Sequence, residues 1–354
     1  MRSKQQPNTS HIPFNRPTIT GYEQQMMNDL YQNPGYFRDR HFHKLCGELL
    51  KTWYRNSNIF LTTSCTHALE LAVELLQLQK DDEVILPSFT YVSTANAVVN
   101  CGARPVFVDI DPASFNMDLS LLQDAITDRT KAIIPVHYSG ISCDIDRMRK
   151  IIRNDIPIIE DAAHSFLAEH HDQKLGTMGE LGCISFDYTK NVSCGHGGML
   201  LVNDSSCLAQ AEIAYEIGTD KAKFLRGEKD FFEWAGAGSK YALSELNAAH
   251  LYAQLQWAQD ITQKRLEAWH YYLNNLSPIA EEHNLQLQNI EATFHYIPLH
   301  NSTYGQQTGR FIHHRGQDNT QNISQRMIRL PLFHGITREE QDRVIESIKS
   351  FYTK

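Results

Sequence analysis

The chain has 354 residues, 42% hydrophobic and 21% charged, which excludes a disordered, collagen-like or coiled-coil protein. At about 150 residues per domain, this length predicts two domains with a large buried core. A formal net charge of −8 argues against a general nucleic-acid-binding protein, and no apolar run reaches the ~20 residues that span a bilayer.

Short β-rich segments alternate with segments of helical periodicity from Ile59 onward. We expect buried strands over residues 83–87, 104–110, 131–138 and 156–162, and helices over 94–100, 120–126 and 144–154. Strand–helix–strand repetition implies parallel pairing, with helices on both faces of the sheet. Two more strands are expected over residues 182–187 and 197–204.

The chain becomes helical after residue 205. A long helix is predicted over residues 244–276, a loop-like polar stretch over 301–325 and a last helix over 339–352. We therefore expect a large domain over residues 12–245 and a smaller C-terminal domain over 246–354.

The first candidate site follows the β run that begins at Ile59, which passes through TTSCT into an amphipathic helix. Ser64 is a good N-cap for this helix. The amides of Cys65 and Thr66 would then lie at its positive end, which suits a phosphate. An ordinary capped helix gives the same pattern, so this feature alone does not identify a site.

Two further candidates follow later strands. The apolar segment 156–162 contains Glu160 and Asp161 near its end, and a buried carboxylate needs a partner such as a protonated ring nitrogen, a helix terminus or a salt bridge. Lys190 lies in a loop between two strands, followed by glycines that allow close backbone approach. Most lysines only solubilise the surface, but one held in such a loop can bond covalently to a carbonyl carbon.

Aromatic and hydroxyl side chains complete this set. Tyr91 comes just after the strand 83–87, where its ring could stack on a planar cofactor, whereas we expect Phe89 in the core. Ser185 lies in the strand before Lys190 and could hydrogen-bond a phosphate. Each signal is weak, but their order along the chain is that of fold-type I enzymes that use pyridoxal phosphate (PLP).

The sequence resembles the DegT/StrS-type nucleotide-sugar aminotransferases, most closely the branch that acts on dTDP-4-oxo-6-deoxy-D-glucose in enterobacterial common antigen assembly. The resemblance implies an aspartate-aminotransferase-like α/β fold with a mostly parallel central sheet flanked by helices, plus a small α+β C-terminal domain. The matching stretches run in family order over nearly the whole chain and include LTTSCTHALELA, DDEVILPSFTYVSTANAVV, IIEDAAHS, SFDYTKN, GHGGMLLVND, FHYIPLH and RLPLF.

The resemblance also implies residue roles. Lys190 matches the lysine that bonds to PLP, Asp161 the partner of its ring nitrogen and His164 a position near its phenolic oxygen. Tyr91 matches the stacking aromatic, and Lys240 lies in a segment that reaches across a dimer. The phosphate site would comprise Ser64, Cys65, Thr66 and Ser185. The substrate-binding residues would be His137, Tyr138, His295, Tyr296 and His300. No metal is implied.

The segment VHYSG, residues 136–140, is similar to the VHYAG of enzymes that aminate C4, whereas enzymes acting at C3 often carry VHLYG. We therefore expect transfer of an amino group from glutamate to the C4 ketone of a dTDP-4-keto-6-deoxy-hexose, in cell-envelope polysaccharide (O-antigen) synthesis. A homodimer with shared active sites is implied. The polar N-terminus and the seven unpatterned cysteines predict a cytoplasmic bacterial protein with neither membrane nor nucleic-acid partners.

The chain departs from the family pattern in three places. Asp187 stands where His is usual, and His196 stands where Glu is usual. A unit of about 30 residues, the size of one β–α–β element, is missing before FHYIPLH, which predicts a shortened C-terminal domain.

Other functions stay open at this stage. The enzyme could act at C3 or on a UDP- or GDP-sugar, or the chain could bind PLP with little turnover. A Cys194–His196 nucleophile pair has no third group to orient it. A metal site is weakly suggested by three histidine pairs, which lack a further ligand at set spacing: His41/His43, His170/His171 and His313/His314.

Overall fold

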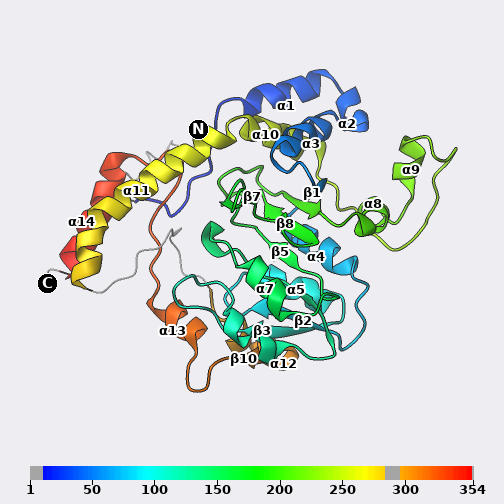
Figure 1. Ribbon diagram of the computed structural model, residues 1–354. Coiled ribbons are helices and arrows are strands. Elements are labelled where there is room, and N and C mark those ends of the chain that lie inside the picture. Colours follow the sequence, from blue (N-terminus) through cyan, green and yellow to red (C-terminus); the bar gives the residue numbers. More distant parts are fainter. Residues whose placement is uncertain (1–10, 284–295, 353–354) are drawn as a thin grey trace.

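A computed structural model describes residues 11–283 and 296–352 (Figure 1). The strands are β1 (Asn58–Thr62), β2 (Glu83–Pro87), β3 (Arg104–Val108), β4 (Thr130–Ile133), β5 (Ile159–Asp161), β6 (Glu169–His170), β7 (Gln173–Lys174), β8 (Leu181–Ser185), β9 (Gly198–Val202) and β10 (Arg310–Ile312). The helices are α1 (Glu23–Gln32), α2 (Gly35–Asp39), α3 (His41–Trp53), α4 (Cys65–Glu74), α5 (Val92–Asn100), α6 (Leu122–Ala125), α7 (Ile145–Ile151), α8 (Leu208–Tyr215), α9 (Lys221–Leu225), α10 (Glu245–Gln256), α11 (Ala258–Glu282), α12 (Thr303–Thr308), α13 (Asn319–Arg326) and α14 (Arg338–Tyr352).

Eight of the strands build the central layer. Two four-stranded sheets, ordered β1-β9-β8-β5 and β10-β3-β2-β4, meet where β4 and β5 run in parallel. Parallel bridges from Ile133 to Ile158 and from Val136 to Asp161 join them. Every neighbouring pair is parallel except the two that involve β9. The expectation of a mostly parallel α/β sheet is therefore confirmed.

Helices cover both faces of this layer, which is why its strands are nearly continuous apolar runs. In β2, Val84 and Leu86 pack into a core cluster shared with α4 and α5. Ile85 points to the opposite face and packs with residues of α6 and α7, as side chains alternate along a strand. The predicted strand 83–87 agrees with β2, whereas β4 and β5 are shorter than predicted.

Two expectations for the C-terminal third are wrong. The predicted helix 244–276 is two helices, because the chain leaves the helical conformation at Trp257 (φ −108°, ψ 7°). The polar stretch 301–325 is not a plain loop, since it contains α12, β10 and α13. The polar composition of the stretch hid a three-residue edge strand, which pairs with β3 and packs Phe311 and Ile312 against the core.

The C-terminal part is mostly helical. α11 and α14 pack along each other (Figure 1), around a small core that includes Tyr272, Leu276 and Ile345. β10 is the one strand among the described residues after 246, and it extends the large sheet. α10, which follows the predicted domain boundary, packs on α1 and α3, which precede it. The division into two domains between residues 245 and 246 stays a prediction. Within the described residues, no helix is long and apolar enough to cross a membrane.

Candidate active site

The start of α4, which we call the α4 cradle, is where the sequence predicts a phosphate site. Ser64 adopts the extended conformation of an N-cap, and its hydroxyl accepts a hydrogen bond from the His67 amide at 3.1 Å. The amides of Cys65 and Thr66 belong to the first turn of the helix, where backbone donors have no intrahelical acceptor. The structure thus agrees with the predicted cap.

The opposite wall of the cradle is β9. Gly198 pairs with Ser185 on β8, and a Cβ atom at Gly198 would lie 2.4 Å from the Cys65 nitrogen. Only glycine leaves room here, so the start of α4 packs against Gly198, the residue that pairs with Ser185. The hydroxyl of Thr66 is 2.7 Å from that of Ser93. Four residues predicted to bind phosphate are therefore close together, beside backbone donors at a helix N-terminus.

Asp161 lies at the end of β5 and is 4% exposed. Its carboxylate accepts hydrogen bonds from the Thr94 hydroxyl at 2.7 Å and from the Ala163 amide at 3.2 Å. Burial raises the pKa of Asp161, and these two hydrogen bonds and the charge of Lys190 offset the rise only in part. A cationic ring nitrogen is the kind of partner this carboxylate would need. No sequence pattern indicated Thr94 as a partner of Asp161.

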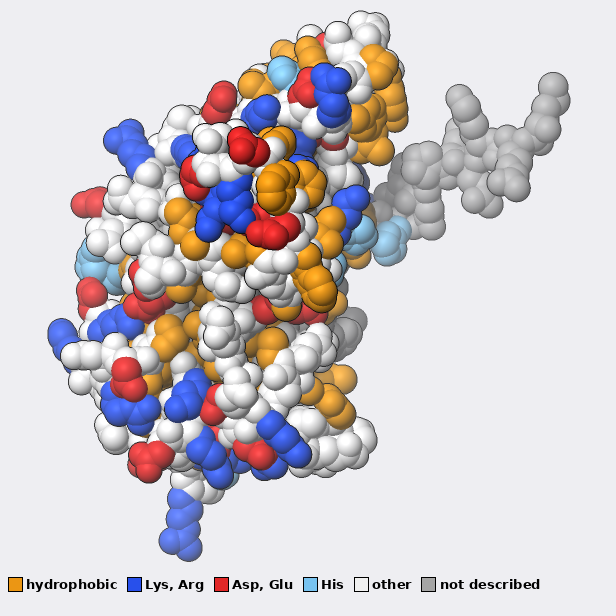
Figure 2. All heavy atoms as spheres, turned by 90° about the vertical axis from the view of Figure 1, so that its right-hand side faces the viewer, with side chains coloured by type: hydrophobic (Ala, Val, Ile, Leu, Met, Phe, Trp, Pro, Cys, Tyr) orange, Lys and Arg blue, Asp and Glu red, His pale blue; other side chains and the backbone are white. Residues whose placement is uncertain are grey.

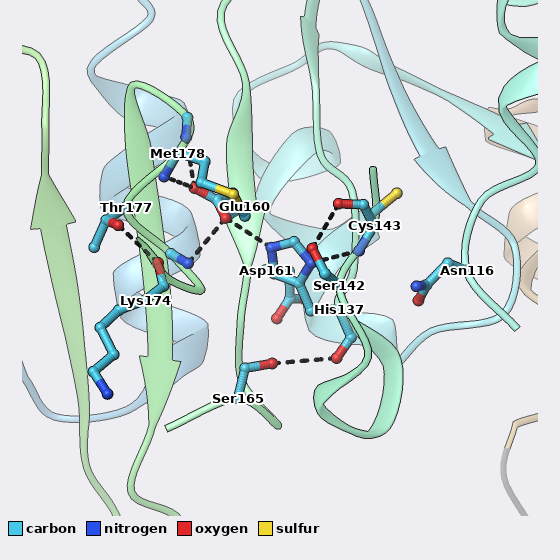
Figure 3. Close-up of polar contacts among 12 residues, drawn as sticks. Asn116, His137, Ser142, Cys143, Glu160, Asp161, Ser165, Lys174, Thr177 and Met178 are labelled. Carbon is cyan, nitrogen blue, oxygen red and sulfur yellow. Dashed lines mark hydrogen bonds and ion pairs between the residues drawn. The ribbon is translucent and has the colours of Figure 1, made fainter. Parts of the chain in front are cut away.

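Glu160, the neighbour of Asp161, points to the other side of β5 and belongs to a separate network (Figure 3). It accepts hydrogen bonds from Nε2 of His137 at 2.7 Å and from the amides of Gly176, Met178 and Gly179. Burial by itself raises its pKa, but the His137 hydrogen bond and these amides hold the pKa below its usual range.

His137 was predicted to bind substrate, and the structure gives its ring another role. The side chain is fully buried, and Nδ1 accepts a hydrogen bond from the Cys143 amide at 3.0 Å (Figure 3). Because Nε2 donates to Glu160, neither ring nitrogen is left for a sugar. His137 instead joins the end of β4 to β5, next to Asp161.

We expect His137→Leu to lower the free energy of unfolding by about 3 kcal/mol at pH 7, because it removes the donor from a buried carboxylate. Since the folded pKa of Glu160 is lowered, its stabilising contribution is present above its unfolded pKa of 4.5 and is lost as the pH falls through the folded value. Urea unfolding at pH 7 and pH 4 measures both effects. The exposed His313→Ala is the control, and equal stability of both variants would contradict the assignment.

Lys190 lies in the loop between β8 and β9 and lines a cavity of about 110 Å³. His164, Ser185 and Asn191 line the same cavity from the sheet side. Thus Lys190, His164 and Ser185, which the sequence predicted separately, meet at one place. The charge of Lys190 also lowers the pKa of Asp161, so the two predicted catalytic side chains interact.

The C-terminal part closes this cavity with two arginines that the sequence did not indicate. Arg265 of α11 and Arg329 each expose only 6% of their surface. Burial lowers the pKa of Arg329 to about 10, so it stays charged at neutral pH. The guanidinium of Arg329 lies over the rings of Tyr138 and Tyr296, 5.2 Å and 5.9 Å from their centres.

Tyr91 is 60% exposed at the start of α5, which leaves its ring accessible to a planar ligand. Its ring centre is 6.3 Å from that of Tyr296. Behind them, Tyr138 is 1% exposed and packs on Phe89, which is fully buried as expected. The predicted substrate residues Tyr138 and Tyr296 therefore belong to an aromatic wall beside Tyr91.

The predicted residues His300 and Lys240 do not line the cavity. His300 is held by Ser88 at 2.6 Å and by Asp318 at 3.1 Å, so both ring nitrogens are used within the chain, and burial lowers its pKa. Lys240 is exposed and forms a backbone bridge with Glu216. His295 lies outside the described residues. In the described ranges, no three His, Cys, Asp or Glu side chains are grouped to hold a metal ion.

A mostly parallel sheet with a phosphate cradle, a buried aspartate and a loop lysine in this order defines a PLP-dependent enzyme of fold-type I. The chain belongs to the DegT/DnrJ/EryC1/StrS aminotransferase family, whose model matches residues 18–288 and 282–349. The two matched stretches overlap at residues 282–288.

Known proteins support this assignment over most of the chain. MJ1066 of Methanocaldococcus jannaschii is 31% identical, covering 87% of this chain and 89% of that protein. The spore coat polysaccharide biosynthesis protein SpsC of Bacillus subtilis is 30% identical, covering 81% and 83%. The Helicobacter pylori aminotransferase PseC, involved in pseudoaminic acid biosynthesis, superposes with a TM-score of 0.82 at 22% identity, covering 97% and 99%. At that identity, the superposition shows the shared fold.

This chain is thus a PLP-dependent sugar aminotransferase, and its described residues fit the cofactor. The α4 cradle would hold the phosphate, and Asp161 would keep the ring nitrogen protonated. PLP, when bound, supplies an electron sink. Lys190 would hold the cofactor and move protons at the reacting carbons, and His164 would lie near its phenolic oxygen.

Proposed function

We propose that the enzyme transfers an amino group from glutamate to the C4 ketone of a dTDP-4-keto-6-deoxy-hexose for cell-envelope polysaccharide synthesis. One observation carries the C4 proposal. Ser139, within the VHYSG segment that resembles C4 enzymes, lines the same cavity as Lys190. Its left-handed backbone (φ 53°) turns the segment at this point. The segment whose sequence resembles that of C4 enzymes therefore lines the same cavity as Lys190, the proposed catalytic lysine.

The charges of the cavity support an anionic donor and an anionic acceptor. Arg265 and Arg329 supply two guanidinium groups beside Lys190, although the whole chain carries a net charge of −8. Guanidinium groups suit carboxylates and phosphates, which they can bind with two parallel hydrogen bonds. Lys190 would remove the proton from the α-carbon of glutamate and, in the second half-reaction, deliver a proton to C4 of the sugar.

A two-stage assay tests this proposal. The PLP-loaded protein is first mixed with glutamate, and release of 2-oxoglutarate is measured. After removal of glutamate, dTDP-4-keto-6-deoxyglucose is added, and NMR locates the new amine on the sugar. We expect one equivalent of each product per active site, with nitrogen at C4. The same assay with the 3-keto isomer and with UDP- and GDP-linked 4-keto sugars compares the alternatives.

Each result of this assay distinguishes the candidates. Amination only of the 3-keto isomer, or only of a UDP- or GDP-sugar, would replace the proposed substrate. A complete first stage with no product from any of these sugars would contradict the substrate class. A failed first stage would overturn glutamate as the donor, and failure with all amino acids would favour a PLP-binding protein with little turnover.

We also propose a homodimer, built through the arm of residues 217–240. The arm carries α9 away from the sheet (Figure 1), and Figure 2 views the face toward which it projects. Trp234 is 84% exposed, and large exposed apolar groups in one segment suit a partner surface. The predicted dimer residue Lys240 ends this arm. The exposed hydrophobic side chains are Ile217, Phe224, Leu225, Phe231, Phe232 and Trp234.

We expect Trp234→Glu to convert the dimer to a monomer and to lower activity at least about tenfold, because a central aromatic contact is typically worth 2 kcal/mol or more. Size-exclusion chromatography with light scattering measures the mass, and the two-stage assay measures the activity. Phe351→Glu, at an apolar site on α14 that is 73% exposed, is the control. A parent protein that is an active monomer would contradict the proposal.

A further inference from the structure

The loop that carries Lys190 runs from the end of β8 to the start of β9. We call the place where these two ends meet the neck of the loop. Phe186 and Gly197 are joined by a backbone hydrogen bond of 2.8 Å at the ends of β8 and β9. Just inside this neck, Oδ2 of Asp187 lies 3.2 Å from Nδ1 of His196. These are the two positions at which the chain departs from its family around the lysine.

Asp187 holds the turn that presents Lys190. Its Oδ1 accepts hydrogen bonds from the amide and the hydroxyl of Thr189, at 3.1 and 2.9 Å. Its backbone carbonyl accepts a hydrogen bond from the Lys190 amide at 2.9 Å. An aspartate that bonds to the backbone two residues ahead in this way stabilises a turn. The direction of the Asp187 side chain is therefore coupled to the backbone of Lys190.

His196 links this turn to α10. The Asn247 side chain donates hydrogen bonds to the carbonyls of Cys194 and His196, each at 2.9 Å. The His196 ring then reaches across the neck to Asp187. A chain of contacts thus runs from α10 through His196 and Asp187 to Lys190, and none of its links requires the cofactor.

The two departures exchange the acidic and the imidazole side chain between two positions that contact each other. The family resemblance implies His at 187 and Glu at 196, whereas this chain has Asp187 and His196. Either arrangement would place one acidic and one imidazole side chain at the two positions, which are in contact in this chain. Either single change alone would instead put two imidazoles or two carboxylates together, and two carboxylates repel each other.

We infer that Asp187 and His196 are a coupled, reversed pair of positioning residues for Lys190. The pair closes the neck of the loop and holds the lysine turn against α10. The inference rests on the role of Lys190 in the aminotransferase reaction and is independent of which sugar is aminated.

Three variants test the coupling: Asp187→His, His196→Glu and the double variant that carries both changes. In the full-length protein without PLP, we expect faster hydrogen exchange of the 187–196 peptide in each single variant and parental exchange in the double variant. In the PLP-loaded protein, we expect each single change to slow the glutamate half-reaction about two- to fivefold, as for an exposed ion pair, with KM unchanged. The double variant should return to within about twofold of the parent.

A matched control is available elsewhere on the surface. His314 pairs with Asp118 at the same distance of 3.2 Å, away from the lysine loop. His314→Glu should leave both the exchange of the 187–196 peptide and the half-reaction unchanged.

Additive losses in the double variant, or single variants that match the parent in both measurements, would overturn the inference. Hydrogen exchange measured without PLP depends on neither the amino donor nor the sugar. It therefore still tests the coupling of Asp187 and His196 if glutamate proves to be the wrong donor. A failed substrate proposal and a failed positioning proposal are therefore distinguishable.

Discussion

Replacing Lys190 by Ala is expected to lower both half-reactions by at least about 10³-fold, in line with the loss of a group that carries protons in both directions. The cavity around Lys190 also contains His164, Ser185 and Asn191, and none of these is an amine that could take its place. Borohydride reduction followed by peptide mass analysis should find the cofactor on Lys190 in the parent and on no lysine in the variant.

The control for this change is Lys131→Ala, which removes an exposed lysine from β4. It should leave both half-reactions unchanged. A Lys190→Ala protein that turned over within about tenfold of the parent would refute the assigned mechanism, because a residual rate that high is above what positioning alone retains.

Replacing Asp161 by Asn is expected to lower the rate by about 10²- to 10³-fold, because the amide cannot keep a ring nitrogen protonated. PLP binding should weaken less, since the α4 cradle is separate from Asp161. The half-reaction with glutamate and the absorption spectrum of the bound cofactor measure the two effects.

The same change should leave the protein without PLP at least as stable at pH 7. The folded pKa of Asp161 is raised by burial, so the folded state favours its protonated form. Stability then falls as the pH rises from the unfolded value of 3.8 through the folded value. A neutral amide removes this cost, while the Thr94 hydroxyl can still donate a hydrogen bond to the side-chain oxygen at position 161.

Thermal unfolding without PLP checks this second outcome, with the exposed Asp155→Asn as the control. An inactive variant that is also much less stable than the parent would point to a structural role for Asp161. An active variant would remove Asp161 from the reaction.

Local patterns predicted most of the sheet, and they indicated the residues that we propose for the cofactor site. The strand β2 was predicted to the residue, because five consecutive buried side chains bounded by turns have few alternatives. The Ser64 cap and the loop position of Lys190 also depend on neighbouring residues alone. The sequence predicted one helix across Trp257, because the apolar periodicity continues through this residue. The division into α10 and α11 is seen only in the tertiary structure.

Histidine roles were the least predictable part. His137 and His300 lie in motifs that suggest substrate contact, yet both ring nitrogens of each are bonded within the chain. Their partners lie up to 212 residues away along the sequence, so no local pattern could identify them. Thr94, Arg265 and Arg329 were missed for the same reason.

By itself, the sequence predicted the class of fold and, through the family resemblance, the cofactor. Those features depend on short segments, whose strands, caps and turns follow from neighbouring residues. Only the tertiary structure decided which side chains share the cavity with Lys190. It also decided that Asp187 and His196, two apparent departures, are one contact. Long-range pairing of strands and helices sets such contacts, and a linear pattern does not contain it.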